Sequence, residues 1–198
     1  LFRSTIPGII MKIVDPETLI EKKEGESGEI ILRGPTITEG YFNGVEHTEK
    51  ALVQLPGADE AYLRTGDIGL VINEELFVTG RIKDTIIIRG VQYQAEDLEY
   101  VASTCHAQLS PSGTAAFSVD QGDGEKLVLV QEVKKEKWDN CDREELNTKI
   151  KDAIFSAFGL SIHDLILVPQ GPIPKTTSGK VRRQASRVQY EQQRFRNV

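Results

Sequence analysis

The first 80 residues alternate between short apolar runs and segments rich in glycine, proline and polar residues. Runs rich in β-branched residues predict strands at 8–14 and 28–34, with a polar loop between them. A brief helix is expected at 46–53 and a further strand at 75–79. The run at 84–89 is almost wholly apolar, which predicts a strand that is buried on both of its faces.

After Gly90 the pattern changes to alternating helices and strands. The strongest helical signal covers 143–158, where an apolar residue recurs every four positions, and Gly159 is the expected stop. The other expected elements are helices at 95–105 and 183–195, the second polar and basic, and strands at 114–119, 126–133 and 165–168. These elements describe a small α/β domain.

The change of pattern near Lys83 predicts two parts: a β-rich part at 1–82 and an α/β part at 83–198, together an α+β chain. A length of 198 residues fits one or two domains, and 39 % hydrophobic residues are enough to form a core. Because residue 1 is Leu and the sequence opens in mid-pattern, we expect a piece of a longer chain.

The sequence also indicates a compartment. No apolar run approaches the roughly 18 residues of a membrane span. The opening segment is broken at Pro7 and Gly8 and lacks a cleavage site, so no signal peptide is expected. Cys105 and Cys141 are far apart and form no Cys-x-x-Cys pair, which favours reduced thiols and a cytoplasmic location. The three histidines show no metal-ligand spacing, so no metal site is expected.

The net charge of −6 is unevenly distributed. From Gly171 to Val198 seven basic residues stand against one acid, Glu191, so this segment carries +6 and the rest of the chain −12. A basic tail on an acidic body suits a nucleic-acid arm, a docking surface or a phosphate-binding lid. Only Tyr190 and Phe195 interleave aromatic rings with the basic residues, which disfavours nucleic acid as the partner.

Three stretches carry candidate chemistry. In TTSGK at 176–180, a glycine before a lysine lets backbone amides approach an anion, but a P-loop is excluded because Pro174 and Val181 stand where Gly and Ser or Thr are required. Asp67, in a Thr-Gly-Asp turn, is either a turn cap or a carboxylate that accepts both hydroxyls of a ribose. Arg81 can give paired hydrogen bonds to phosphate or form a surface ion pair.

Four segments in order resemble the signatures of the acyl-adenylate-forming superfamily, which includes acyl-CoA synthetases, fatty-acyl-AMP ligases, peptide-synthetase adenylation domains and luciferases. They are GEIILRGPTITEGYFN at 28–43, YLRTGD at 62–67, GRIKDTIIIRG at 80–90 and PKTTSGKVRR at 174–183. The resemblance implies that 1–82 is the last, barrel-like β subdomain of a large N-terminal adenylating domain. It also implies that 83–198 is a mobile C-terminal domain, which rotates about a hinge at Lys83.

The same resemblance implies roles for particular residues. Asp67 would hold the ribose hydroxyls of ATP, and Tyr62 and Thr65 of the same motif would also belong to the ATP/AMP site. Arg81 would contact ribose and phosphate. Lys180 would be the catalytic residue that bridges the substrate carboxylate and the α-phosphate. The cofactors would be ATP and Mg²⁺, with most Mg²⁺-site residues in a preceding part of the chain.

Within the superfamily, the segments at 86–99 and 113–133 look most like fatty-acyl-AMP ligases, apart from Ala95 where many relatives have proline. Such enzymes activate a fatty acid with ATP and pass the acyl group to the phosphopantetheine thiol of an acyl carrier protein. An acyl-CoA synthetase and a non-catalytic adenylation-like binding domain are the alternatives. The resemblance implies that the 198 residues alone do not catalyse the reaction, because the other parts of the active site precede them in the family.

Overall fold

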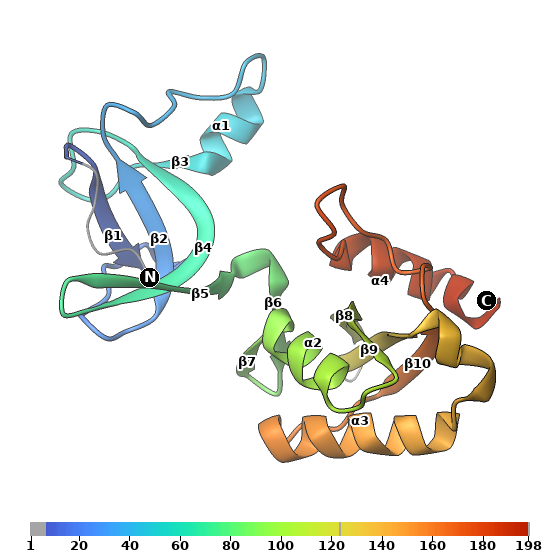
Figure 1. Ribbon diagram of the computed structural model, residues 1–198. Helices are drawn as coiled ribbons and strands as arrows, with labels where there is room; N and C mark the ends of the chain where they lie inside the picture. The colour runs from blue at the N-terminus through green and yellow to red at the C-terminus, as the bar shows by residue number, and fades with distance from the viewer. Residues whose placement is uncertain (1–6, 123, 198) are drawn as a thin grey trace. The chain divides into compact units, whose positions relative to one another are not determined.

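The computed structural model describes residues 7–122 and 124–197, and the chain divides into two compact units, Leu1–Lys83 and Asp84–Val198 (Figure 1). The division falls one residue after the boundary expected from the sequence. The chain is a mixture of α and β structure, and its first unit holds a curled sheet, as the predicted fold class requires.

The first unit is built on one antiparallel sheet in which β4 is the central strand. β4 pairs with β2 on one side and with β3 and β5 on the other, and β1 pairs with β2. Val14, Ile31 and Tyr62 form the core of this unit together with Leu55. The elements are β1 (Ile10–Val14), β2 (Gly28–Arg33), α1 (Val45–Ala51), β3 (Leu52–Val53), β4 (Tyr62–Ile72), β5 (Glu75–Arg81) and the 3₁₀ turn η1 (Ile82–Asp84).

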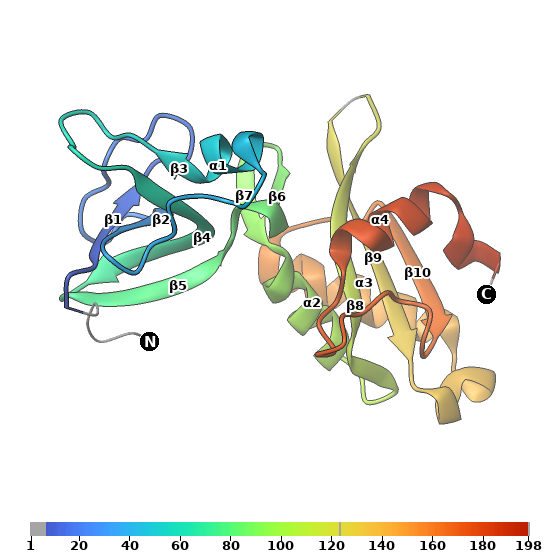
Figure 2. The same ribbon diagram turned by 90° about the horizontal axis from the view of Figure 1, so that it is seen from above.

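The second unit has a three-stranded sheet in the order β10-β9-β8, with β10 parallel and β8 antiparallel to β9. A two-stranded hairpin, β6–β7, precedes it. Figure 1 shows α3 and α4 on opposite sides of the three-stranded sheet, and Figure 2 gives a second view of them. The elements are β6 (Thr85–Ile88), β7 (Val91–Gln94), α2 (Ala95–Thr104), β8 (Leu109–Asp120), β9 (Glu125–Val133), η2 (Lys135–Asn140), α3 (Arg143–Phe158), β10 (Asp164–Pro169), α4 (Arg183–Glu191) and η3 (Arg194–Asn197).

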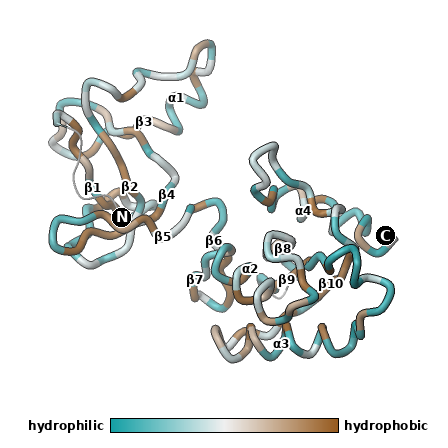
Figure 3. The backbone as a smooth tube through the Cα atoms, viewed as in Figure 1, coloured by the Kyte–Doolittle hydropathy of each residue, from teal (hydrophilic) through white to brown (hydrophobic). Residues whose placement is uncertain are grey.

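The apolar run in β9 explains the two layers of helices. Successive side chains of a strand point to opposite faces of the sheet. Leu127 and Leu129 therefore pack in the core under α2 and α3, whereas Val128 and Val130 pack in a second core with Phe195. Each face must be covered because every one of these four positions is apolar. Figure 3 shows the complementary pattern in α3, where hydrophobic and hydrophilic residues alternate along the helix.

Most of the expected elements are present. The predicted helix at 143–158 has the observed bounds, and Gly159 ends it in the left-handed conformation with φ of 67°. The expected helix at 183–195 is too long, because α4 ends at Glu191 and Gln193 has a positive φ of 56° that no helix continues through. The expected helix at 46–53 ends earlier for a similar reason: Leu52 is already extended and pairs with β4.

The prediction that 84–89 is buried on both faces is wrong. Ile86 and Ile88 are buried in the core, but the side chain of Ile87 between them is 48 % exposed. β6 pairs only with β7 among the described strands, and its alternating side chains place Ile86 and Ile88 in the core and Ile87 on the solvent side. The apolar run therefore indicated that a strand forms here, but not whether both of its faces are covered.

Candidate functional site

Asp67 lies within a strand and not in the turn that the sequence suggested. It belongs to β4 and stands opposite Arg81 of β5 in the antiparallel register. Where β4 pairs with β2, the register slips: Ile68 pairs with Glu29 and Arg64 with Ile31, so the three residues 65–67 face one residue of β2. Gly66 makes this bulge possible because its φ is +72°, a conformation that residues with a Cβ rarely adopt.

Two side chains fix the shape of this bulge. Glu29 is 1 % exposed, and its carboxylate accepts hydrogen bonds from Arg64 Nε at 2.8 Å and from the Gly66 amide at 3.2 Å. The hydroxyl of Thr65 donates to the Ile30 carbonyl at 2.7 Å and accepts from the Asp67 amide at 3.0 Å. A buried carboxylate is stable only when it is paired and hydrogen-bonded, so Glu29 and Arg64 form one unit that supports Asp67.

The structure brings Asp67 and Arg81 together. Arg81 Nε donates to Asp67 Oδ1 at 2.8 Å, and the two side chains are 67 % and 31 % exposed in that order. An exposed pair of this kind contributes little to stability. A carboxylate can accept hydrogen bonds from hydroxyl groups, and a guanidinium can donate hydrogen bonds to phosphate. The pair is thus built to be reached from solvent.

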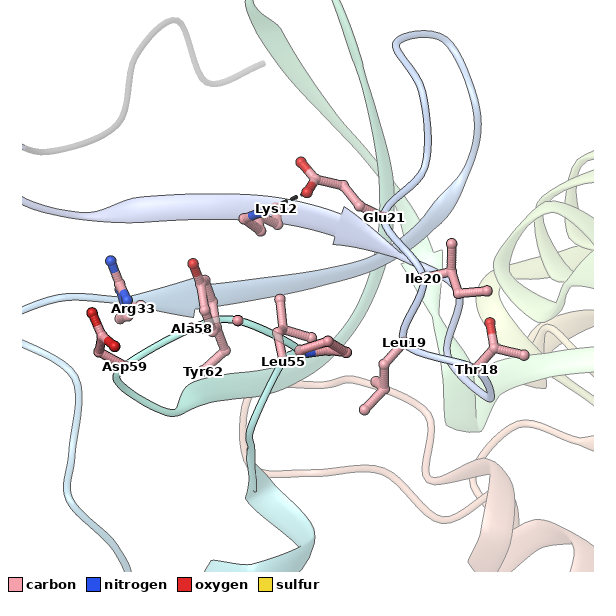
Figure 4. Close-up of a pocket in the computed structure, with 12 residues that line it drawn as sticks. Lys12, Thr18, Leu19, Ile20, Glu21, Arg33, Leu55, Ala58, Asp59 and Tyr62 are labelled. Carbon is pink, nitrogen blue, oxygen red and sulfur yellow. Dashed lines mark hydrogen bonds and ion pairs between the residues drawn. The ribbon is translucent and has the colours of Figure 1, made fainter.

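Tyr62 is placed differently. It is 3 % exposed within the core of the first unit, and the guanidinium of Arg33 lies 5.3 Å from the centre of its ring. Its ring lines a hollow of about 480 Å³, which Asp67 and Arg81 do not line (Figure 4). Lys12 and Glu21 face each other across the rim of this hollow in an ion pair of 2.5 Å. The charges of these two side chains therefore compensate each other.

Lys180 lies in the second unit, directly after the turn of a tight hairpin at 175–181. Lys175 and Val181 form an antiparallel bridge at its base, and the Arg182 amide donates to the Pro174 carbonyl at 2.9 Å. Within the hairpin, the Thr176 amide donates to the Lys180 carbonyl at 2.8 Å, and the Lys180 amide donates to the Thr176 hydroxyl at 3.1 Å. The backbone of Lys180 is thus held, while the residue itself is exposed.

Arg183 connects the segment that carries Lys180 to the rest of the second unit. Its guanidinium donates to Glu99 from Nε at 2.8 Å and from Nη2 at 2.7 Å, and to Asp84 from Nη1 at 2.6 Å. Asp84 follows Lys83, the predicted hinge residue, which is exposed at the end of the first unit. Arg183 thus joins the residue after the predicted hinge to the segment that carries Lys180.

The charges of this cluster perturb each other. Burial raises the pKa of the Glu99 carboxyl above its ordinary value, although the hydrogen bond and the charge of Arg183 act in the opposite direction. Burial also opposes the charge on Arg183, but the hydrogen bonds that Arg183 donates to Glu99, together with the charges of Glu99, Asp84 and Glu96, raise its pKa. Arg183 therefore stays charged, and ionised Glu99 depends on it.

The residues that support the site were not among the candidates expected from the sequence. Asp67, Arg81 and Lys180 were expected. Glu29, which braces the bulge, was not, nor was Glu132, a residue of β9 that is fully buried and bonded to the segment before Lys180. A signal for Glu29 existed, because it lies at the start of the 28–43 motif. A charged residue inside the apolar run of β9 was the corresponding signal for Glu132.

Among residues 7–122 and 124–197, no three His, Cys, Asp or Glu side chains gather as metal ligands would. Within the same residues, none of the helices has both the length and the apolar character needed to cross a membrane.

Known proteins resemble the chain over nearly its whole length. The chain is 40 % identical to FadD21 of Mycobacterium leprae, provisionally named a fatty-acid–CoA ligase, over 94 % of its own length and 33 % of that protein. It is 37 % identical to JamA of Moorena producens, named a medium-chain-fatty-acid–[acyl-carrier-protein] ligase, over 93 % of its length and 32 % of JamA. It resembles a solved structure of the fatty acyl-adenylate ligases from E. coli and L. pneumophila with a TM-score of 0.75 and 29 % identity, over 96 % of its length and 32 % of that chain.

The fold and the ordered motifs define a member of the acyl-adenylate-forming superfamily, and the resemblance inferred from the sequence is confirmed. More narrowly, the chain belongs to the family described as Disco-interacting protein 2-like, AMP domain, whose model matches residues 83–198. The chain spans about a third of the length of the curated relatives that it matches.

Proposed function

We propose that this chain is the part of a fatty-acyl-AMP ligase that carries a ribose-binding bulge, at 65–67, and a mobile hairpin with Lys180, at 175–181, which we call the lysine hairpin. The whole enzyme would activate a fatty acid with ATP, release pyrophosphate and pass the acyl group to the phosphopantetheine thiol of an acyl carrier protein. The observation that carries this proposal is the pairing of half-buried Asp67 with exposed Arg81 beside a bulge that buried Glu29 braces. The similarity to JamA supports a carrier protein as the acceptor.

Each exposed group has a role that its chemistry suits. The carboxylate of Asp67 accepts hydrogen bonds from the two hydroxyls of the ribose. Arg81, which already faces Asp67 in the register of β4 and β5, donates to ribose and phosphate. Lys180 places a cation where the negative charge builds up as the fatty-acid carboxylate attacks the α-phosphorus and pyrophosphate leaves. The ammonium group offsets this charge without taking part in a covalent step.

The described residues offer no group of three side chains that could bind a metal ion together, so they do not fit a Mg²⁺ site of their own. The division of the chain after Lys83 supports the proposal that the second unit rotates about this position between the two half-reactions. The free thiols of Cys105 and Cys141 support a reducing, cytoplasmic location as part of the same proposal.

The test uses the full-length protein with MgATP and fatty acids of several chain lengths, with either CoA or a phosphopantetheinylated carrier protein. Products are identified by mass spectrometry. We expect acyl-AMP to accumulate with CoA and to discharge onto the carrier protein. No adenylate with any acid would contradict the proposal and favour a non-catalytic binding domain.

Lys180→Ala tests the assigned catalytic residue. It should slow acyl-AMP formation by about 10²–10³-fold, as loss of one transition-state donor does in other enzymes. Transfer from preformed acyl-AMP to the thiol should suffer far less. Lys151→Ala, at an exposed position of α3, is the matched control and should change neither step. Equal losses in both steps would refute the role of Lys180.

One alternative rests on a specific observation. FadD21 is provisionally named a fatty-acid–CoA ligase, so CoA is the competing acceptor. Acyl-CoA as the main product in the same assay would assign the protein to the acyl-CoA synthetases. The roles proposed for Asp67, Arg81 and Lys180 belong to adenylate formation and would be unchanged.

A further inference from the structure

Glu132 is a buried carboxylate whose partners all lie in one distant segment. It is 0 % exposed in β9, the middle strand of the sheet in the second unit. One carboxylate oxygen, Oε1, accepts hydrogen bonds from the amides of Gly171 at 3.0 Å and Ile173 at 3.2 Å. The other, Oε2, forms an ion pair with Lys175 Nζ at 2.7 Å. The three donors come from a stretch of five residues that ends where the lysine hairpin begins.

The sequence of that stretch explains why a carboxylate is needed. In Gly-Pro-Ile-Pro-Lys at 171–175, the two prolines have no amide hydrogen, so Gly171 and Ile173 supply the backbone donors before Lys175. The side chain of Ile173 is 2 % exposed and packs in the core on the other side. Glu132 thus holds the polar side of the segment while the core holds its apolar side. Burying a charge is costly unless it is paired and hydrogen-bonded. The Glu132 carboxylate has both, through its ion pair with Lys175 and its hydrogen bonds from the two amides.

The surroundings of Glu132 are adapted to its side chain. Gly113 of β8 faces it, and a Cβ added at position 113 would lie 2.6 Å from the Cβ of Glu132. Such a contact is too close for two carbon atoms that are not bonded, so glycine leaves room for the glutamate. The position of the carboxylate is therefore defined by the sheet itself.

The hairpin transmits this position to Lys180. Lys175, held by Glu132, bridges to Val181, and the Arg182 amide bonds to the Pro174 carbonyl. Lys180 directly precedes Val181 on the loop side of both contacts and is further bonded through Thr176. A shift of Lys175 must therefore move Lys180, which has few other contacts because it is exposed.

We propose that Glu132 is a positioning residue for Lys180: it ties the segment 171–175 to the sheet and thereby sets where the lysine ammonium is presented during acyl-adenylate formation. This inference rests on the proposed function. A displacement of about 1 Å in a positioned group can lower a rate by about 10²-fold, so the effect is measurable.

The test combines four variants of the full-length protein: Glu132→Gln, Lys180→Ala, the double variant of both, and Glu132→Gln with Lys175→Gln. The amide at position 132 keeps one carbonyl oxygen for the two backbone donors but turns an NH₂ group toward the Lys175 ammonium, where two donors face each other. Glu125→Gln, the same change at an exposed position of β9, is the matched control.

We expect Glu132→Gln to slow acyl-AMP formation by about 10²-fold and to affect acyl transfer from supplied acyl-AMP far less. The double variant with Lys180→Ala should be no slower than Lys180→Ala alone, because residues that act through one group are not additive. Adding Lys175→Gln should restore part of the rate, because its carbonyl oxygen can accept from the new NH₂ group. A purely structural role predicts neither the unequal effect on the two steps nor this rescue.

A second measurement does not depend on activity. Hydrogen exchange of the amides in segment 174–182 should accelerate at least about tenfold in Glu132→Gln and stay unchanged in Glu125→Gln, because losing a hydrogen bond to a charged group costs enough for such a change. Unchanged exchange overturns the inference, as does additivity with Lys180→Ala. A wild-type protein that forms no acyl-AMP contradicts the proposed function instead, and the exchange result still decides the role of Glu132 in holding the hairpin.

Discussion

Replacing Arg183 by methionine should destabilise the second unit more than the same replacement of an exposed charged residue on the same helix. The side chains of Arg183 and Glu99 are each 13 % exposed, and Asp84 is 25 % exposed. Arg183→Met keeps much of the apolar stem but leaves the carboxylate of Glu99 buried without a cation. Breaking a buried pair from one side costs about 3–5 kcal/mol, because the remaining charge is uncompensated.

The single tryptophan of the sequence makes the measurement specific. Trp138 packs against the core of the second unit, and Arg143 lies 4.2 Å from the centre of its ring, so its fluorescence reports on that unit and not on the first. In urea, with an m-value of about 2 kcal/mol/M, the expected loss lowers the unfolding midpoint by roughly 1.5–2.5 M. Unfolding should be followed by fluorescence at constant pH.

Two further variants isolate the cause. Arg187→Met removes an exposed pair with Glu191 on the same helix, which is worth only about 0.3–0.5 kcal/mol. Arg183→Met combined with Glu99→Gln should recover much of the loss, because the amide is neutral and still accepts the hydrogen bond that the Ala116 amide gives to Glu99. If Arg183→Met were no more destabilising than Arg187→Met, the argument from buried charge would be refuted.

Three other predictions concern Glu29, Glu99 and Cys105. Glu29→Gln should accelerate hydrogen exchange at Gly66 by about tenfold or more, since a hydrogen bond to a charged group is worth about 1.5–3 kcal/mol, and should weaken nucleotide binding at Asp67. The raised pKa of Glu99 means that its contribution to stability is present below its ordinary pKa and lost as pH rises through the raised value, so urea midpoints of Arg183→Met should increase from pH 8 to pH 5. Burial raises the pKa of the Cys105 thiol, so alkylation by iodoacetamide at pH 8, followed by mass spectrometry, should be slower than that of an unfolded control.

Local patterns were sufficient for much of the fold. The four-residue spacing in α3 and the glycine after it are properties of consecutive residues, so the helix and its end could be predicted. The motifs likewise identified the superfamily, because each is a contiguous segment and their order is specific. Asp67, Arg81 and Lys180 could be named as candidates for the same reason.

The failures have a common cause. The apolar run that contains Ile87 predicted burial on both faces, but a strand cannot show from its own residues whether a second layer covers it. The Thr-Gly-Asp segment was expected to be a turn, yet its register against β2 and β5 makes it a bulge inside a strand. Both outcomes depend on partners that are distant in the chain.

The sequence by itself therefore determined the periodic elements, the family and the exposed groups that carry the proposed chemistry. Only the tertiary structure decided how those groups are held, because their supports come from remote positions. Arg183 meets Asp84 across 99 residues and Glu99 across 84, and Lys175 meets Glu132 across 43. A charged side chain in a sequence is ordinarily expected at the surface. It becomes a buried support only when folding brings enough donors to it to compensate for its lost hydration.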